Sequence, residues 1–197
     1  MNNKYFYLIT FTFFSIISGQ NMNNTEIATV GGGCFWCIEA VYQRIEGVIS
    51  VVPGYAGGKS KTTTYKEVCK GKTGHAEVAK IEFNKDIISY KQLLNIFWQA
   101  HDPTTLNRQG NDIGTQYRSV IYYHNDEQKM TAVKSKSEAG KSGYWDDEIV
   151  TEISEINNYS DAEDYHDNYY DNNPNQPYCV FVIKPKLDKL VREGIIK

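Results

Sequence analysis

The sequence predicts an α+β protein, a two-layer sandwich built around one mixed β-sheet. Helix-like and strand-like periodicities intermix along the 197 residues, so neither type of element dominates. Several links between expected strands are too short for the crossover that parallel strands need, so some strand pairs must be antiparallel. With 41% hydrophobic residues, a chain of this length can bury one core.

The first half of the chain begins with a short apolar strand over 27–30, which ends in three glycines. From Cys34 to Gly47, apolar residues recur every three or four positions, which predicts a helix. A strand over 48–52 and a glycine-rich loop over 53–58 follow. Alternation over 75–83 indicates a half-buried strand, and Ser89 is the expected N-cap of a helix that runs to about residue 101.

The second half opens with a polar loop over 104–114, which has no periodicity. A strand is predicted over 119–123, then a charged helix capped by Asp126 that ends near residue 139. The remaining expected elements are a strand over 149–156, a short helix over 161–170, a last strand over 178–183 and a terminal helix over 185–191. Long loops in a compact domain are often functional.

Charge and length exclude several classes of protein. The 21 Lys and Arg residues nearly balance the 24 Asp and Glu residues, giving a net charge of −3. That balance argues against a nucleic-acid binder that relies on bulk positive charge, so we expect no nucleic-acid partner. Four cysteines in this length are too few for a disulfide-stapled scaffold.

The first twenty residues have the pattern of a secretory signal peptide. Lys4 is followed by an apolar run over 5–17 and by small residues suited to cleavage. The run is shorter than the ~20 residues of a membrane-spanning helix. We therefore expect export to a secreted or periplasmic location, with 21–197 as one soluble domain. If the segment is not a signal, an uncleaved anchor or a cytoplasmic location is the alternative.

Cys34 is the most informative residue, because it follows three glycines and begins a helix. Unsatisfied N–H groups and the helix dipole favour a thiolate there, so the sequence predicts a nucleophile with a lowered pKa. Phe35 and Trp36 carry large rings that could form one side of a pocket for an apolar substrate group. A buried and inert cysteine is the alternative interpretation.

Cys37 completes a Cys-x-x-Cys pair one helical turn after Cys34. Such pairs occur in thiol–disulfide oxidoreductases, and they also supply two of the four ligands in many zinc sites. Cys69 and Cys179 have no second ligand at matching spacing, so we expect no metal. Two other enzyme hypotheses remain open at this point, a thioredoxin-like exchanger and a hydrolase that pairs Cys34 with His75 or His166.

The residues GCFW over 33–36 resemble the catalytic signature of the peptide methionine sulfoxide reductase A family. Further blocks resemble that family in the same order: PGYAGG over 53–58, YKEVC over 65–69, TGHAE over 73–77, HDP over 101–103, RQGNDIGTQYRS over 108–119 and AEDYH over 162–166. The resemblance spans roughly 27–185. The fold that it implies, an α+β sandwich of ferredoxin-like type, agrees with the periodicities.

The resemblance implies a reaction and assigns roles. Cys34 would attack the sulfur of a methionine S-sulfoxide, in peptides or as the free amino acid, while Glu77 protonates the leaving oxygen. Tyr65 and Tyr117 would donate hydrogen bonds to that oxygen. Residues that would border or order the substrate site are Phe35, Trp36, Asp112, Asp164 and His166. Alternation places Glu77 on an apolar strand face, where a carboxyl is expected to keep its proton. A turn-forming Asp112 and a structural His166 are the alternatives.

The sulfenic acid left on Cys34 needs a second thiol to form a disulfide. Many family members have glycine at the position of Cys37 and carry this resolving cysteine in a glycine-rich C-terminal tail, so this sequence departs from their pattern. Cys37 and Cys179 are both candidates, with Cys37 slightly favoured. A thioredoxin-like donor would then reduce the disulfide, and no cofactor is implied. We expect a monomer.

Overall fold

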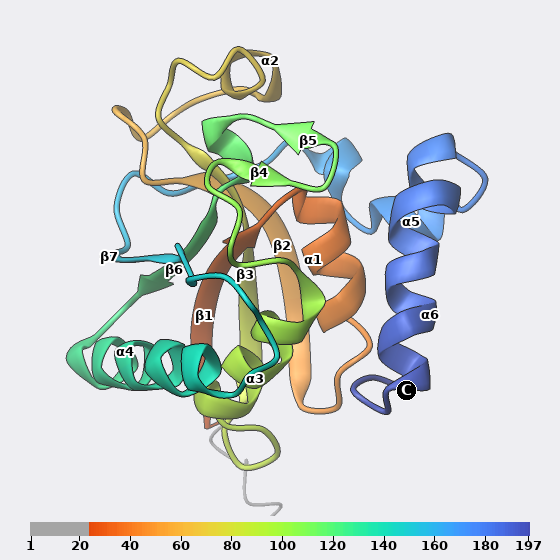
Figure 1. Cartoon of the computed structure of the whole chain (residues 1–197). Helices are drawn as coiled ribbons and strands as arrows, with labels where there is room; N and C mark the ends of the chain where they lie inside the picture. Colours follow the sequence, from red (N-terminus) through yellow and green to blue (C-terminus); the bar gives the residue numbers. More distant parts are fainter. Residues whose placement is uncertain (1–23) are drawn as a thin grey trace, which may run out of the picture.

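The computed structural model describes residues 24–197, which form a six-stranded mixed sheet with helices packed on it (Figure 1). The strand order is β7-β6-β1-β3-β2-β8. β6 and β7 are parallel, and every other neighbouring pair in this sheet is antiparallel. The predicted α+β sandwich around a mixed sheet is therefore confirmed. The predicted signal segment, 1–20, lies outside the described residues.

The strands are built on buried apolar alternation. The sheet consists of β1 (Thr25–Gly32), β2 (Val48–Ala56), β3 (Ala76–Asn84), β6 (Ser119–Tyr123), β7 (Glu152–Glu155) and β8 (Ser160–Asp161). A separate two-stranded hairpin pairs β4 (Arg108–Gln109) with β5 (Asp112–Ile113). Along β3, Ala79, Ile81 and Phe83 enter the main core beneath the helices, while Val78 packs on the other face.

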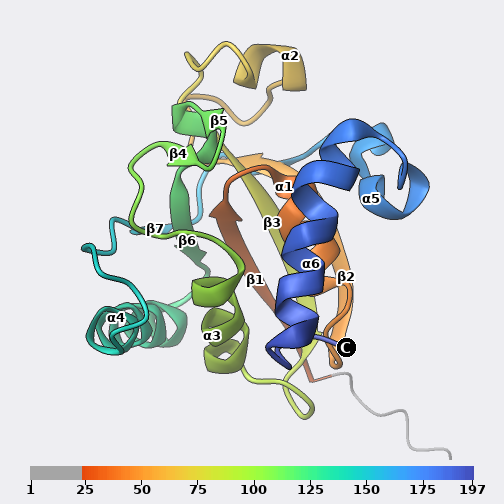
Figure 2. The same cartoon turned by 45° about the vertical axis from the view of Figure 1, so that its right-hand side comes forward.

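The helices are α1 (Phe35–Tyr42), α2 (Tyr65–Val68), α3 (Tyr90–Ala100), α4 (Asp126–Lys141), α5 (Tyr169–Asn172) and α6 (Lys184–Arg192). Short 3₁₀ turns occur at η1 (Thr115–Tyr117) and η2 (Asp164–His166). In Figures 1 and 2, α6 runs along the outside of α1, and α3 and α4 lie together toward the opposite edge of the sheet. Among residues 24–197, none of the helices has the length and apolar character needed to cross a membrane.

Most of the predicted elements occur where the periodicity placed them, and Ser89 caps α3 by accepting a hydrogen bond from the Gln92 N–H. Several boundaries were wrong. β1 is longer than predicted and includes Gly31 and Gly32, and β7 covers only Glu152–Glu155. β2 extends through Pro53 and Gly54 to Ala56, because its last residues pair with β3 and β8 instead of forming a loop. α1 ends at Tyr42, before the predicted Gly47. Asn125, not Asp126, caps α4.

Three segments differ more substantially from the prediction. The polar loop over 104–114 contains the β4–β5 hairpin. The predicted helix over 161–170 is interrupted, because Asn168 adopts a left-handed φ of 54° between η2 and α5. The predicted strand over 178–183 is a π-helical turn, η3 (Cys179–Ile183), that leads directly into α6.

The last difference has a visible cause. In η3 the buried residues are Cys179 and Ile183, four positions apart, whereas Val180, Phe181 and Val182 are exposed. That is a helical pattern of burial, although the apolar run itself cannot distinguish strand from helix. Pro185 follows at the start of α6, where its missing N–H is tolerated, and the wider π turn lies directly before it.

Candidate functional site

Cys34 lies at the junction of β1 and α1, and the glycines before it allow a tight approach to β3. A Cβ atom on Gly31 would lie 2.6 Å from the carbonyl oxygen of Glu77. Gly33 has a φ of +93°, and the side chain of Gln109 packs directly against it. The sequence therefore brings the start of α1 onto the strand that carries Glu77.

Cys34 and Cys37 are free thiols, both are buried, and the pKa of each depends on the other. The Cys34 thiol lowers the pKa of Cys37 to about 7. Burial raises the pKa of Cys34, and so do Cys37 and the charge of Glu77. The prediction of a lowered pKa for Cys34 is therefore wrong for the resting pair. Cys34 is the N-cap residue of α1, and the backbone N–H of Trp36 lowers its pKa, but this effect is smaller than those of burial, Cys37 and Glu77, which raise it.

Glu77 is a buried carboxyl beside the nucleophile, only 1% exposed. Its Oε2 accepts a hydrogen bond of 3.1 Å from the backbone N–H of Phe35, the residue after Cys34. Its Oε1 is buried and has no hydrogen-bond partner within residues 24–197. Burial raises the pKa of Glu77 to about 8. At neutral pH this carboxyl is a proton donor with a free oxygen.

Aromatic rings enclose the space beside the thiol pair. Trp36 stacks on Tyr169 with the ring centroids 3.6 Å apart, and its indole N–H donates to Nδ1 of His166 at 3.1 Å. The His166 ring also lies 4.8 Å from Phe35 and 4.6 Å from Tyr65. Burial lowers the pKa of His166, so its ring is neutral. His166 thus orients Trp36, which makes it a structural part of the wall.

Tyr65 and Tyr117 contribute hydroxyl groups near Glu77. Burial and the Glu77 charge raise the pKa of both phenols, and Cys69 adds to this effect at Tyr65. Both hydroxyls therefore keep their protons across the physiological range and can donate hydrogen bonds. Cys69 itself is exposed, so it lies at the rim of this part of the site.

Asp112 joins the site from the β4–β5 hairpin, but Asp164 does not. Asp112 and both cysteines of the pair line one pocket of about 460 Å³. Asp164 is exposed at the start of η2, and no hydrogen bond or ion pair of its side chain is found in the described part of the chain. Its neighbour Glu163 contributes instead, by accepting hydrogen bonds from the Tyr55 hydroxyl and the Tyr65 N–H.

Three further residues of the site escaped the sequence analysis. Glu163 holds α2 in place, as described above. Glu39 accepts hydrogen bonds from the backbone N–H groups of Asn168 and Tyr169, and burial raises its pKa to about 7. It thereby ties α5, and with it the ring of Tyr169, to α1. Tyr178 donates a 2.6 Å hydrogen bond to Asp112, and its hydroxyl lies 3.7 Å from the sulfur of Cys37.

The two alternative partners for Cys34 are engaged elsewhere. The ring of His75 bonds the carbonyl of Ser60, and Nδ1 of His166 accepts from Trp36, so neither histidine is placed as the base of a hydrolase.

Cys179 is fully buried in the same cluster as the thiol pair. Within the part of the chain that the structure describes, no group of three or more His, Cys, Asp or Glu side chains could hold a metal ion.

A buried thiol pair, a protonated buried carboxyl and an aromatic wall are together typical of an oxidoreductase that works through thiols. Comparison with known proteins agrees with this class. The family model described as peptide methionine sulfoxide reductase matches residues 26–197. The chain belongs to this family of oxidoreductases.

Individual relatives span nearly the whole domain. A peptide methionine sulfoxide reductase from Leptospira borgpetersenii is 56% identical over 169 residues, which cover 86% of this chain and 95% of the relative. The structure of reduced Mxr1 from Saccharomyces cerevisiae superposes with a TM-score of 0.74 at 37% identity, covering 79% of this chain and 90% of Mxr1. Mxr1 in complex with Trx2 is also similar, with a TM-score of 0.54 at 27% identity and coverage of 71% and 82%.

Proposed function

We propose that this protein reduces the S epimer of methionine sulfoxide to methionine, in peptides and as the free amino acid. The observation that carries the proposal is the free, buried oxygen of Glu77 beside Cys34. A sulfoxide oxygen must be protonated as it leaves, and a carboxyl with a pKa of about 8 holds the proton that this step needs. The aromatic wall of Phe35 and Trp36 suits the methyl group of the substrate.

In the first step, the sulfur of Cys34 attacks the sulfoxide sulfur. The pKa of Cys37 is lowered and that of Cys34 is raised, so the proton of Cys34 passes to Cys37 as the nucleophile forms. Glu77 donates its proton to the oxygen, which Tyr65 and Tyr117 also stabilise by hydrogen bonds. Methionine leaves, and the oxygen remains on Cys34 as a sulfenic acid.

In the second step, Cys37 condenses with this sulfenic acid to give a disulfide and water. Cys37 lies one helical turn after Cys34 and lines the same pocket. Cys179 is the other candidate, but it is completely buried on η3 and does not line this pocket. These positions favour Cys37 as the resolving cysteine.

A thioredoxin-like protein would reduce the disulfide, as the complex of the similar Mxr1 with Trx2 suggests by analogy. The cycle needs no bound cofactor, because the two thiols carry both electrons. We propose that residues 1–20 direct export and that the enzyme works in a secreted or periplasmic setting. Without a functional signal it would act in the cytoplasm. We also propose that it works as a monomer.

The test uses a peptide with one methionine sulfoxide of defined configuration. The native protein should reduce the S epimer and not the R epimer, and Cys34→Ser should abolish the reaction. Cys69→Ser is the matched control, and it should retain activity because Cys69 lies exposed at the rim. Full activity of Cys34→Ser would overturn the proposal.

The identity of the resolving cysteine is tested separately, by mass mapping after one turnover without reductant. The expected product links Cys34 to Cys37. A Cys34–Cys179 disulfide, or normal disulfide formation in Cys37→Ser, would refute the second step and leave the first intact.

A further inference from the structure

Cys37 is the first member of a hydrogen-bonded series of polar side chains, Cys37, Tyr178 and Asp112, that the reaction described above does not use. The Tyr178 hydroxyl lies 3.7 Å from the Cys37 sulfur and donates a 2.6 Å hydrogen bond to Oδ2 of Asp112. The three groups come from α1, the segment before η3 and the β4–β5 hairpin, so the fold assembles them from distant parts of the sequence. Cys37, Tyr178 and Asp112 all line the same pocket.

The direction of these hydrogen bonds determines what the chain can do. The single proton of Tyr178 is directed at Asp112, so the phenol oxygen is free to accept the S–H proton of Cys37. A proton can therefore leave the thiol in two coupled transfers, in which Tyr178 gives its own proton to Asp112 as it accepts the proton of Cys37. Burial and the charges of Cys34 and Cys37 raise the pKa of Tyr178, so the phenol passes a proton on without becoming a lasting phenolate.

The second step of the cycle requires such an exit. After sulfoxide reduction Cys37 holds the proton that it received from Cys34, and a neutral thiol is a poor nucleophile. The Cys37 side chain is almost completely buried, so little of it meets the solvent directly. The ionisable groups that face Cys37 are Cys34, Glu77, Asp112, Tyr178, Cys179 and Lys186. Among the described residues, Tyr178 is the group of this set that makes a hydrogen bond both to the sulfur and to a carboxylate.

We propose that Tyr178 is a catalytic residue of the resolving step and that Asp112 is its positioning partner, together removing the proton from Cys37. The proposal rests on the assignment of Cys37 as the resolving cysteine. The Cys37 sulfur attacks the Cys34 sulfur, the new S–S bond forms and the S–O bond of the sulfenic acid breaks. The departing hydroxide takes a proton from solvent and leaves as water, while Asp112 releases the relayed proton to solvent. One thiol and one sulfenic acid thus give one disulfide and one water.

The test follows the two steps separately in single turnovers with a methionine S-sulfoxide peptide. Methionine release reports the first step, and trapping of the sulfenic acid with dimedone, followed by mass spectrometry, reports how long it persists. Tyr178→Phe keeps the ring that packs edge-on against Trp36 and removes only the hydroxyl. Tyr170→Phe is the matched control on the neighbouring helix α5, because no hydrogen bond of its hydroxyl is found among the described residues.

The expected result is that Tyr178→Phe still releases one equivalent of methionine but forms the disulfide on the order of 10²-fold more slowly at neutral pH. This defect should shrink as the pH rises towards the ordinary thiol value of about 8.5, because hydroxide then removes the proton directly. Asp112→Asn should show the same pH-dependent rescue, and Tyr170→Phe should match the native protein. A role of Tyr178 in packing alone would give a defect that does not change with pH.

Two outcomes would overturn the proposal, and they are distinguishable. If Cys37→Ser still forms the internal disulfide, the assignment of Cys37 fails and the relay with it. If Cys37→Ser stops disulfide formation but Tyr178→Phe forms it at the native rate at every pH, the assignment stands and the relay alone is refuted. Rates of Cys37 alkylation against pH, measured on the reduced proteins, give a second readout, and Tyr178→Phe should shift that profile to higher pH.

Discussion

Replacing Glu77 by glutamine should make the protein more stable and less active, and the gain in stability should grow with pH. Glutamine has the shape of the protonated carboxyl but cannot ionise. The native carboxyl has a pKa of about 8 in the fold, against an ordinary value of 4.5. In the unfolded chain this carboxyl therefore loses its proton at a much lower pH than in the folded protein. Above pH 4.5 this difference favours unfolding.

The magnitude follows from these two values. At about 1.4 kcal/mol for each pH unit, the destabilisation is roughly 2 kcal/mol at pH 6 and levels off at roughly 5 kcal/mol by pH 9. The advantage of Glu77→Gln over the native protein should therefore widen by about 3 kcal/mol between these two conditions. Over the same range the sulfoxide-reducing step should be slower in the variant by about 10²- to 10⁴-fold, the usual contribution of a general acid.

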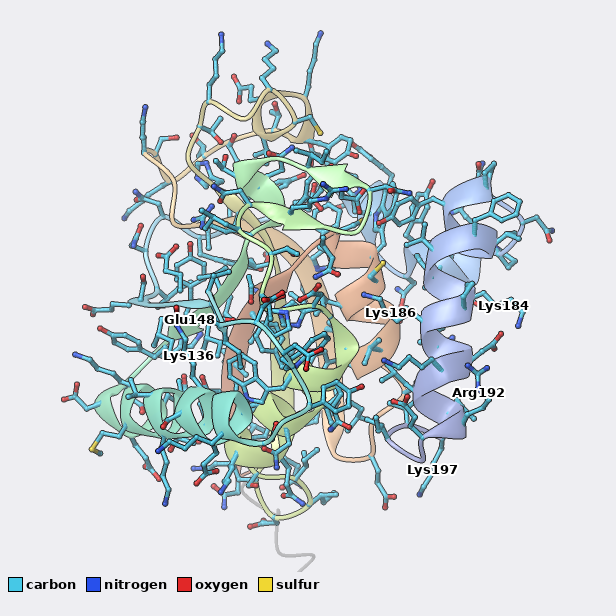
Figure 3. All side chains as sticks on the ribbon, viewed as in Figure 1. Lys136, Glu148, Lys184, Lys186, Arg192 and Lys197 are labelled. Carbon is cyan, nitrogen blue, oxygen red and sulfur yellow. The ribbon has the colours of Figure 1, made fainter. Side chains whose placement is uncertain are left out.

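The assay is urea unfolding of the reduced proteins at both pH values, with activity measured on the same samples. Glu148→Gln is the matched control, because Glu148 is an exposed carboxyl, labelled in Figure 3. Its replacement should leave the change in the free energy of unfolding between pH 6 and pH 9 the same as in the native protein. If the stability advantage of Glu77→Gln is the same at pH 6 and pH 9, the carboxyl is not held protonated by the fold. The assignment of Glu77 as the acid would then fail.

Three further predictions follow from the same geometry. The rate of sulfoxide reduction in single turnovers should fall as the pH rises through about 8, because Glu77 then loses the proton that it must donate; a rate that keeps rising would contradict this role. Gly31→Ala should lower the free energy of unfolding by about 1–3 kcal/mol in urea, since its Cβ would lie 2.6 Å from the Glu77 carbonyl oxygen; unchanged stability would show that the strands can separate freely. Lys186→Gln should raise the pKa of Cys37, measured from alkylation rates, because the lysine charge lowers it and Lys186 lies on the side of α6 that faces α1 (Figure 3). Lys184→Gln is the control and should have no effect, since Lys184 is paired with Asp188 away from the site.

Local signals in the sequence were sufficient for the elements that carry the nucleophile and the acid. Alternation along β3 correctly places Glu77 on the same side as Ala79 and Ile81, which is a buried face of the sheet. Gly31 and Gly32 end β1 and Gly33 follows it, and close contacts together with the positive φ of Gly33 account for this run, as the residue type suggests. The glycines themselves are a local signal, although the groups that they contact come from distant segments.

The features that were missed depend on contacts between distant segments. Tyr178 meets Cys37 across 141 positions and Asp112 across 66, so no local pattern could have joined them. The prediction for the pKa of Cys34 was wrong because burial, Cys37 and the charge of Glu77 raise this pKa by more than the N–H of Trp36 at the helix start lowers it. The apolar run over 178–183 was ambiguous in itself, and its burial against α1 decided its helical form.

The stacking of Trp36 on Tyr169, with Glu39 anchoring α5, has a consequence for the order of events during synthesis. The thiol pair emerges from the ribosome within the first quarter of the chain, but the ring that completes its wall comes more than 130 residues later. Tyr178 and Lys186 follow later still. A nascent chain therefore carries both cysteines without a pocket, and the catalytic centre assembles only after nearly the entire polypeptide has been made.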